Sequence, residues 1–158
     1  MTAPLRGALE QAVPQGDRLL LDTTVLISYL EGGDRWSEAA RVIIEDFVRP
    51  GRNPCVVSAI SIMESLVRPM RRVPPGHQTA LEFFAHWPNL VVLPTDVAVA
   101  LEAASIRARH NVKPPDALII GTGLVAGVSC LVTGDEAWQR RLAQIESRIR
   151  VCYLGDFV

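Results

Sequence analysis

Residues 18–30, Arg18-Leu-Leu-Leu-Asp22-Thr-Thr24-Val-Leu-Ile-Ser-Tyr-Leu30, join an apolar run directly to a polar helix start. Three consecutive leucines predict a buried strand, and the polar trio after them predicts the first turn of a helix. This order places Asp22 at the carboxyl end of the strand, where open α/β sheets bind their ligands. A carboxylate at that point is either a helix cap or a metal ligand. The other side chains that reach the same edge decide between the two.

Apolar runs and helical patterns alternate along the rest of the chain. The predicted strands are residues 19–21, 54–57, 90–93, 129–132 and 149–153. Because these runs are apolar without alternation and are separated by helices, they predict a parallel sheet covered on both faces, an α/β fold. In the helix predicted for residues 96–110, we expect the inward-facing residues to be Val97, Ala100, Leu101, Ala104 and Ile106.

Length and composition fit a single globular domain. The chain has 158 residues, of which 49% are hydrophobic and 21% are charged, enough to build a real core. Residues 1–17 contain two prolines and no periodicity, so they are predicted to be a mobile N-terminal tail. Residues 18–158 are predicted to form one domain.

Charge and cysteine usage limit the classes of function. A formal net charge of −1 predicts no strong attraction of the whole molecule to nucleic acid. Cys55, Cys130 and Cys152 form no CxxC motif and lie in or beside apolar runs, which predicts buried, reduced thiols. No signal-peptide h-region precedes residue 18, and the apolar segment 117–132 is too short to span a bilayer. We therefore expect a soluble, cytoplasmic protein.

Four carboxylates occupy positions that can meet at one edge of the sheet: Asp22, Glu64, Asp116 and Asp135. Each has a purely structural alternative. Asp22 and Asp135 follow strands and can cap helices, Asp116 begins a helix, and Glu64 can form a capping box with Ser61 or stay exposed. Four carboxylates in one cleft repel one another, however, and such a cluster needs a cation. All-oxygen ligands with no nearby His or Cys favour Mg²⁺ or Mn²⁺ over zinc.

Basic side chains flank two of these carboxylates in the sequence. Three follow Glu64 and three precede Asp116: Arg68, Arg71, Arg72, Arg107, Arg109 and Lys113. An acidic pocket with a basic rim suits a phosphodiester, with a metal ion at the scissile phosphate and arginines on the flanking phosphates. The alternative is that these residues are solvated helix ends.

The motifs Asp22-Thr-Thr24, Glu64, Lys113-Pro-Pro-Asp116 and Thr133-Gly-Asp135, in this order and at these spacings, resemble those of the PIN domain. Within that family, their size and spacing are most similar to the VapC-type toxins of toxin–antitoxin pairs. The resemblance implies a three-layer fold with a parallel five-stranded sheet flanked by helices. It also implies a Mg²⁺-dependent endoribonuclease that acts on RNA, is usually a homodimer, and is silenced by a cognate antitoxin.

The resemblance also assigns roles to individual residues. Asp22, Glu64, Asp116 and Asp135 match the acidic residues that hold the metal and carry out catalysis, with Glu136 as the alternative to Asp135. Two threonines match positions that support the metal or its waters: Thr24 and Thr133. One or two Mg²⁺ ions, which Mn²⁺ can replace, would lower the pKa of a bound water and neutralise charge on the phosphate.

Two other classes of protein remain open. In an aspartyl-phosphate phosphatase Asp22 would be the nucleophile, but such enzymes have Asp-x-Asp where this chain has Asp22-Thr-Thr24. In a PIN-like or receiver-like binding scaffold the same fold would bind a partner without catalysis. Phosphate release from a small phosphoester would indicate the phosphatase, and metal binding without cleavage would indicate the scaffold.

Overall fold

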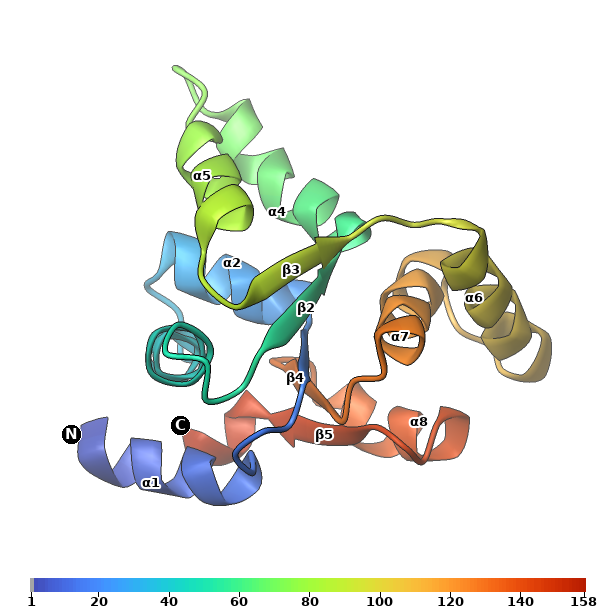
Figure 1. Ribbon diagram of the computed structural model, residues 1–158. Helices are drawn as coiled ribbons and strands as arrows, with labels where there is room; N and C mark the ends of the chain where they lie inside the picture. The colour runs from blue at the N-terminus through green and yellow to red at the C-terminus, as the bar shows by residue number, and fades with distance from the viewer. Residues whose placement is uncertain (1) are drawn as a thin grey trace.

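The computed structural model describes residues 2–158, and its centre is a five-stranded parallel sheet (Figure 1). The strand order is β3-β2-β1-β4-β5, and every neighbouring pair is parallel. The strands are β1 (Leu19–Leu21), β2 (Cys55–Ser58), β3 (Leu90–Leu93), β4 (Cys130–Thr133) and β5 (Arg150–Tyr153). Each lies within one residue of a predicted strand at its start and within one at its end, so the predicted parallel sheet is confirmed.

Helices connect the strands and cover both faces of the sheet (Figure 1). They are α1 (Thr2–Ala12), α2 (Thr23–Glu31), α3 (Ser37–Arg41), α4 (Ala59–Arg71), α5 (Gln78–His86), α6 (Val97–Arg109), α7 (Pro114–Ala126) and α8 (Ala137–Ile145). A π-helix, η1 (Val42–Val48), continues α3, and a 3₁₀-helix, η2 (Leu154–Phe157), follows β5. Within residues 2–158, none of these helices combines the length and the hydropathy needed to cross a bilayer.

The strand side chains divide the core into two layers, one on each face of the sheet. Leu19 and Leu21 pack into the core that includes α2, α3, η1 and α5. Leu20, between them, points to the opposite core, which α6, α7 and α8 cover. This alternation is the period-two geometry of a strand. The predicted three-layer α/β fold is confirmed, and the three cysteines are buried free thiols as predicted.

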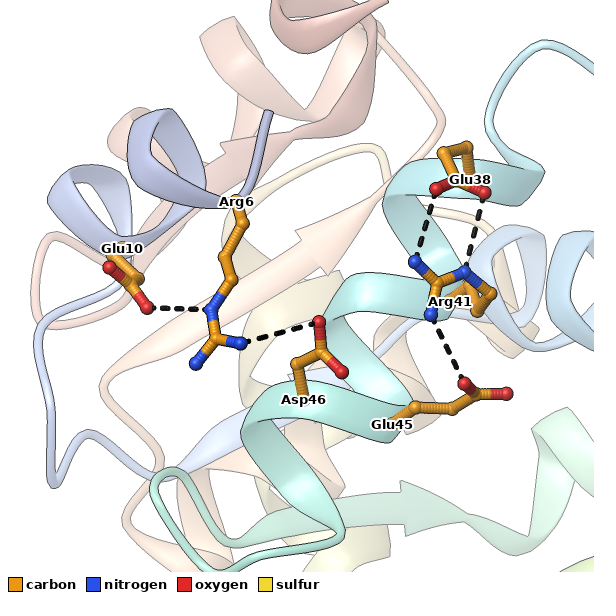
Figure 2. Close-up of polar contacts among 6 residues, drawn as sticks. All are labelled: Arg6, Glu10, Glu38, Arg41, Glu45 and Asp46. Atoms are coloured by element: carbon orange, nitrogen blue, oxygen red, sulfur yellow. Dashed lines mark hydrogen bonds and ion pairs between the residues drawn. The ribbon is translucent and has the colours of Figure 1, made fainter. Parts of the chain in front are cut away.

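The prediction of a mobile tail at residues 1–17 is wrong for residues 2–17, and Met1 lies outside the described residues. Leu9 and Val13 are fully buried against the core. Arg6 binds Glu10 one turn along α1 at 2.9 Å and approaches Asp46 of η1 at 3.9 Å (Figure 2). The prolines did not prevent the helix: Pro4 lies in its first turn, where a proline removes no intrahelical hydrogen bond, and Pro14 lies beyond its end.

The segment between α1 and β1 is also held in place. The Asn53 side chain donates to the backbone carbonyls of Pro14 and Asp17 at 2.8 and 3.0 Å, and Arg52 donates to that of Val13 at 2.9 Å. Asn53 is fully buried, so its polar atoms need these partners. Residues 13–17 therefore form an ordered connection into the central strand.

The prediction of which side of α6 faces inward is largely wrong. Val97 and Leu101 are 76% and 67% exposed, whereas Val99, Ala103 and Ile106 are buried. The other two predicted inward residues, Ala100 and Ala104, are also exposed; only the burial of Ile106 is confirmed. The helix is apolar around most of its circumference, so its sequence pattern did not select one face.

Close packing between α6 and α7 selected the inward face of α6. A Cβ atom at Gly121 of α7 would lie 2.9 Å from the Val99 carbonyl oxygen and 3.2 Å from the Ala103 nitrogen. The backbones can approach this closely only because Gly121 has no side chain and Ala103 has a small one. This contact fixes the position of α7, the helix that carries Asp116.

Truncation of Leu9 to alanine should destabilise the protein by about 2–5 kcal/mol, the usual cost of removing a buried leucine side chain. Gln11→Ala is the control, because Gln11 lies on the exposed side of the same helix and its loss should cost less than about 0.5 kcal/mol. Chemical denaturation of both variants measures the difference. Equal stability of Leu9→Ala and wild type would mean that α1 does not pack on the core in solution.

Candidate functional site

The carboxyl ends of the central strands bring the four predicted carboxylates into one region. Asp22 directly follows β1, and Asp135 follows β4, the strand paired with β1. Glu64 lies on α4, which leaves the sheet from β2, and Asp116 lies in the first turn of α7. Their charges are close enough to interact: Asp116 helps to raise the pKa of Asp22, and Glu64 and Asp135 help to raise that of Asp116.

Asp22 is a buried carboxylate with three hydrogen-bond donors. Its Oδ1 accepts from the backbone N–H of Thr23 at 2.8 Å, so the aspartate caps α2, as the structural alternative predicted. Its Oδ2 accepts from the hydroxyls of Thr24 at 3.1 Å and Thr133 at 2.7 Å. Capping therefore uses only one of its two oxygens. Burial raises the pKa of Asp22 above its usual value, and the three donors oppose this effect only in part.

Thr24 and Thr133 link Asp22 to the turn that follows β4. Besides donating to Asp22, the Thr24 hydroxyl accepts from the backbone N–H of Gly134 at 2.8 Å. The Thr133 hydroxyl accepts from the backbone N–H of Asp135 at 2.9 Å. Each threonine hydroxyl thus donates a hydrogen bond to the Asp22 carboxylate and accepts one from a backbone N–H of the β4–α8 turn. This network fixes Asp22 relative to Asp135.

Glu64 is positioned by a residue that the sequence reasoning missed. The Thr23 hydroxyl donates to Glu64 Oε1 at 2.8 Å and lies 2.9 Å from the hydroxyl of Ser61. The capping-box alternative for Ser61 and Glu64 is wrong, because Ser58 is the N-cap of α4 and accepts from Ile60. The only sequence signal for Thr23 is its place in the polar run after the first strand, which does not indicate that its hydroxyl reaches Glu64.

Asp116 is half-buried at the start of α7, after two prolines that occupy the first helical positions. Burial is the main reason that its pKa is raised, and the negative charges of Asp135 and Glu64 raise it further. Arg141 opposes this rise, with Nη1 3.9 Å from Asp116 Oδ2. The net direction is upward, so the ionised carboxylate is disfavoured in the folded chain.

Arg141 was not predicted as a site residue. It lies on α8 with its guanidinium 5.0 Å from the ring centre of Trp138, a side chain that is only 2% exposed. The helical spacing of Trp138, Leu142 and Ile145 marks the buried face of α8. Arg141 directly precedes Leu142, so a helical projection of this segment would have placed it at the border of that face.

Asp135 also has a structural role. Its Oδ1 accepts from the backbone N–H of Ala137 at 3.0 Å at the start of α8, as the capping alternative predicted. Its charge nevertheless contributes to the raised pKa of Asp116. Glu136, the neighbouring carboxylate, is the N-cap residue of α8 and is exposed.

The four carboxylates are neighbours but do not converge on one point. Within the part of the chain that the structure describes, no three His, Cys, Asp or Glu side chains are close enough to hold a metal ion together. The donor set still fits Mg²⁺, because this ion keeps several waters and is usually held by only one or two carboxylates. The raised pKa values of Asp22 and Asp116 are a further sign of fit, since a bound cation would favour their charged forms.

The basic residues after Glu64 lie farther along α4, away from Asp22. Arg68 and Arg72 bind Glu31, the last residue of α2, at 3.3 and 3.4 Å. Because α2 has nine residues and rises about 1.5 Å per residue, this contact lies roughly 13 Å along the helix from Asp22. Arg71 is exposed at the end of α4.

The basic residues before Asp116 remain near the start of α7. Lys113 is the exposed residue that precedes the helix. Arg107 donates through Nε to the Val112 carbonyl at 3.2 Å, and Arg109 through Nε to that of Ser105 at 3.3 Å. The structure thus separates the predicted basic rim into two groups, and only this second group adjoins Asp116 in the chain.

Solved structures with the same fold include two-protein complexes. The chain is similar to a toxin–antitoxin complex from Klebsiella pneumoniae, with a TM-score of 0.62, 21% identity, and 87% of this chain and 97% of that chain covered. The similarity to a DNA-bound VapBC from Salmonella typhimurium has a TM-score of 0.61, 21% identity and coverage of 87% and 98%. The similarity to FitAcB from Neisseria gonorrhoeae has a TM-score of 0.62 and 19% identity, and it covers 87% of this chain and 98% of that chain.

Comparison with curated protein sequences gives no match. The family comparison is more informative, because the PIN domain matches residues 19–144, from the first residue of β1 to the last turn of α8. This range includes the four carboxylates and the threonines that bind them. The chain belongs to the PIN domain family.

Proposed function

We propose that this protein is a Mg²⁺-dependent endoribonuclease, the toxin of a toxin–antitoxin pair. The observation that carries the proposal is Asp22, a buried carboxylate with a raised pKa, placed among three other carboxylates by dedicated hydroxyl donors. Burying such a group without a counter-charge is costly, so the arrangement is explained by a cation. Membership of the PIN family and the similarity to toxin–antitoxin complexes support the same function.

The carboxylates would hold the metal, and the other residues would orient them. Asp22, Glu64 and Asp116 would bind Mg²⁺ directly or through water, with Asp135 completing the site. A bound ion supplies an activated water and neutralises charge on the scissile phosphate. Thr133 and Thr24 hold Asp22 through its Oδ2, and Thr23 holds Glu64.

RNA is the proposed substrate, and its phosphates would meet the basic residues beside the acidic site. Arg107, Arg109 and Lys113 precede Asp116 in the chain and would contact phosphates near the scissile bond. The other proposed contacts, Arg68, Arg71 and Arg72, lie at the end of α4, so they would serve only a longer RNA. The proposal also includes a cytoplasmic homodimer and a cognate antitoxin that covers the acidic site.

A binding scaffold without catalysis is the alternative. It would bind a metal ion at the acidic site, but it would not cleave RNA. The intact set of four carboxylates favours the enzyme, since a scaffold gains nothing from keeping mutually repelling charges.

Removing one negative charge from the site should abolish RNA cleavage. We expect Asp22→Asn, Glu64→Gln and Asp116→Asn each to lower the Mg²⁺-dependent rate by roughly a hundredfold or more, since even residues that only support metal ligands are worth 10–100-fold. A nuclease assay and circular dichroism on the same samples separate lost chemistry from lost structure. Glu82→Gln, an exposed glutamate on α5, is the control. Full activity in two of the three variants would refute the site.

Thr133→Val should weaken the site without changing its charge. The substitution keeps the volume but removes the 2.7 Å donor to Asp22 and the acceptor for Asp135 N–H. We expect metal affinity and activity to fall by roughly 10–100-fold. Titration calorimetry with Mn²⁺ measures the affinity. Thr122→Val is the matched control, because Thr122 is equally buried but donates to a carbonyl within α7; an equal loss in both variants would count against the proposed role.

In EDTA, Asp116→Asn should raise the melting temperature at neutral pH. The pKa of Asp116 is raised in the folded chain, so its ionised form costs folding free energy that asparagine does not. This cost is absent below the ordinary aspartate pKa, about 3.9, and increases as the pH rises through the folded pKa. The advantage of the variant should therefore be full near pH 7 and absent at about pH 3, as thermal melts across this range will measure.

Metal addition completes the same experiment. Mg²⁺ at about 100 times its dissociation constant should stabilise the wild type by about 2.7 kcal/mol, and the variant less. Glu38→Gln is the control, because Glu38 is an acidic residue in the first turn of α3, outside the site. If Asp116 served only the helix dipole, its loss would cost about 0.3–1 kcal/mol in EDTA and leave the metal response intact.

A further inference from the structure

A cleft adjoins the acidic site on the side of α8. It has a volume of about 300 Å³ and lies between α8 and the loop that joins α6 to α7. Its polar lining residues are Arg109, His110, Asn111, Arg141 and Gln144. No carboxylate is among them, so the cleft is a basic and amide-lined neighbour of an acidic site.

Arg141 lies at the boundary between the cleft and the acidic site. It lines the cleft, and its Nη1 is 3.9 Å from Asp116 Oδ2. The stacking on Trp138, whose ring is buried, limits the positions that the guanidinium can occupy. About a third of the Arg141 side chain is exposed, so the group can still meet a ligand.

The contact with Asp116 does not use up the charge of Arg141. At 3.9 Å between partly exposed side chains, it is a weak ion pair that contributes little to stability. It also leaves the other guanidinium N–H groups available. An arginine fork binds a phosphate through two parallel hydrogen bonds, which is a stronger arrangement than its single long contact here.

On the side of the cleft away from Asp116, the carboxylate of Glu146, which follows the lining residue Ile145, is already paired. Its two carboxylate oxygens accept from Arg148 at 2.7 and 2.8 Å. This pairing, together with the charge of Arg109, lowers the pKa of Glu146 to about 2. The positive charges of Arg109 and Arg141 therefore dominate the cleft, and an anion is the ligand that it suits.

We propose that this cleft binds a phosphate of the RNA next to the scissile bond, with Arg141 as the contact closest to the carboxylates. The inference rests on the proposed ribonuclease activity and adds a substrate subsite to it. The cleft is at the small end of the range of ligand sites, which suits one phosphate with part of its nucleoside. Arg141 would exchange its weak contact with Asp116 for the phosphate, and so place the chain of the RNA against the acidic site.

Binding of a fluorescent single-stranded RNA, measured by anisotropy in EDTA over a range of salt concentrations, tests the proposal without cleavage. Arg141→Gln should weaken binding by roughly tenfold, the usual value of one charge-assisted contact. It should also reduce the slope of log affinity against log salt by about 0.7, the value for one phosphate contact with a single strand. Arg140→Gln is the matched control: Arg140 is the adjacent, exposed arginine of α8 and does not line the cleft.

Two further variants separate phosphate binding from charge balance. Arg141→Gln also removes the positive charge beside Asp116, and the unbalanced Asp116 carboxylate would by itself repel RNA. The effect of Arg141→Gln is therefore also measured in the Asp116→Asn background. If Arg141 contacts a phosphate, the salt slope falls by the same amount there; if it only offsets the charge of Asp116, the slope does not change. Arg141→Lys keeps the charge, so it should keep the slope while binding less tightly, and it serves if Arg141→Gln does not fold.

The outcomes distinguish this subsite from the proposed function. An unchanged salt slope for Arg141→Gln in both backgrounds, with RNA still cleaved by the wild type in Mg²⁺, overturns the subsite alone. Loss of slope in a protein that binds RNA but never cleaves it supports the subsite and overturns the ribonuclease. A wild type that neither binds RNA in EDTA nor cleaves it in Mg²⁺ overturns both.

Discussion

The burial of one carboxylate at the end of the central strand constrains much of this structure. Asp22 directly follows β1, which has a strand on each side, and its carboxylate has little access to water. Its backbone N–H donates to the Val132 carbonyl of β4, and its side chain takes three further donors. The two threonines after β1 and the Thr133 hydroxyl donate hydrogen bonds to Asp22. Without them its charge would be too costly to bury.

The same donors do not neutralise the site; they only orient it. Hydroxyls and one backbone N–H compensate part of the lost hydration of Asp22, and its pKa remains raised. Asp116 adds a second carboxylate, which is only half-buried and also has a raised pKa. Arg141 is the main positive charge that opposes this rise. The site therefore carries an excess of negative charge, which a cation would balance.

The second half of the fold supplies the other wall of the site through backbone packing. The close approach of α6 and α7 at Gly121 sets where α7 begins, and hence where Asp116 lies. Gly123 makes a similar approach to β1, since a Cβ atom there would lie 2.8 Å from Leu20. The apolar helix α7 is thus packed against both the sheet and α6, and its N-terminus alone reaches the site. Arg141 then comes from α8, the next helix along the chain.

The amino-acid sequence by itself determined the parallel sheet, the strand positions and the location of Asp22 and Asp135 after two of the strands, because these depend on local patterns. Apolar runs without alternation specify buried strands, and polar residues directly after them must lie at the carboxyl edge of the sheet. The buried state of the cysteines followed for the same reason.

Only the tertiary structure decided which residues bind the four carboxylates. Thr23 reaches Glu64 across 41 positions and Arg141 reaches Asp116 across 25, and no local pattern encodes such contacts. The order of residues 2–17 and the inward face of α6 were likewise settled by packing, since prolines obscured one helical pattern and uniform hydrophobicity the other. Contacts between distant segments depend on how close two backbones can approach, which is a property of the folded chain.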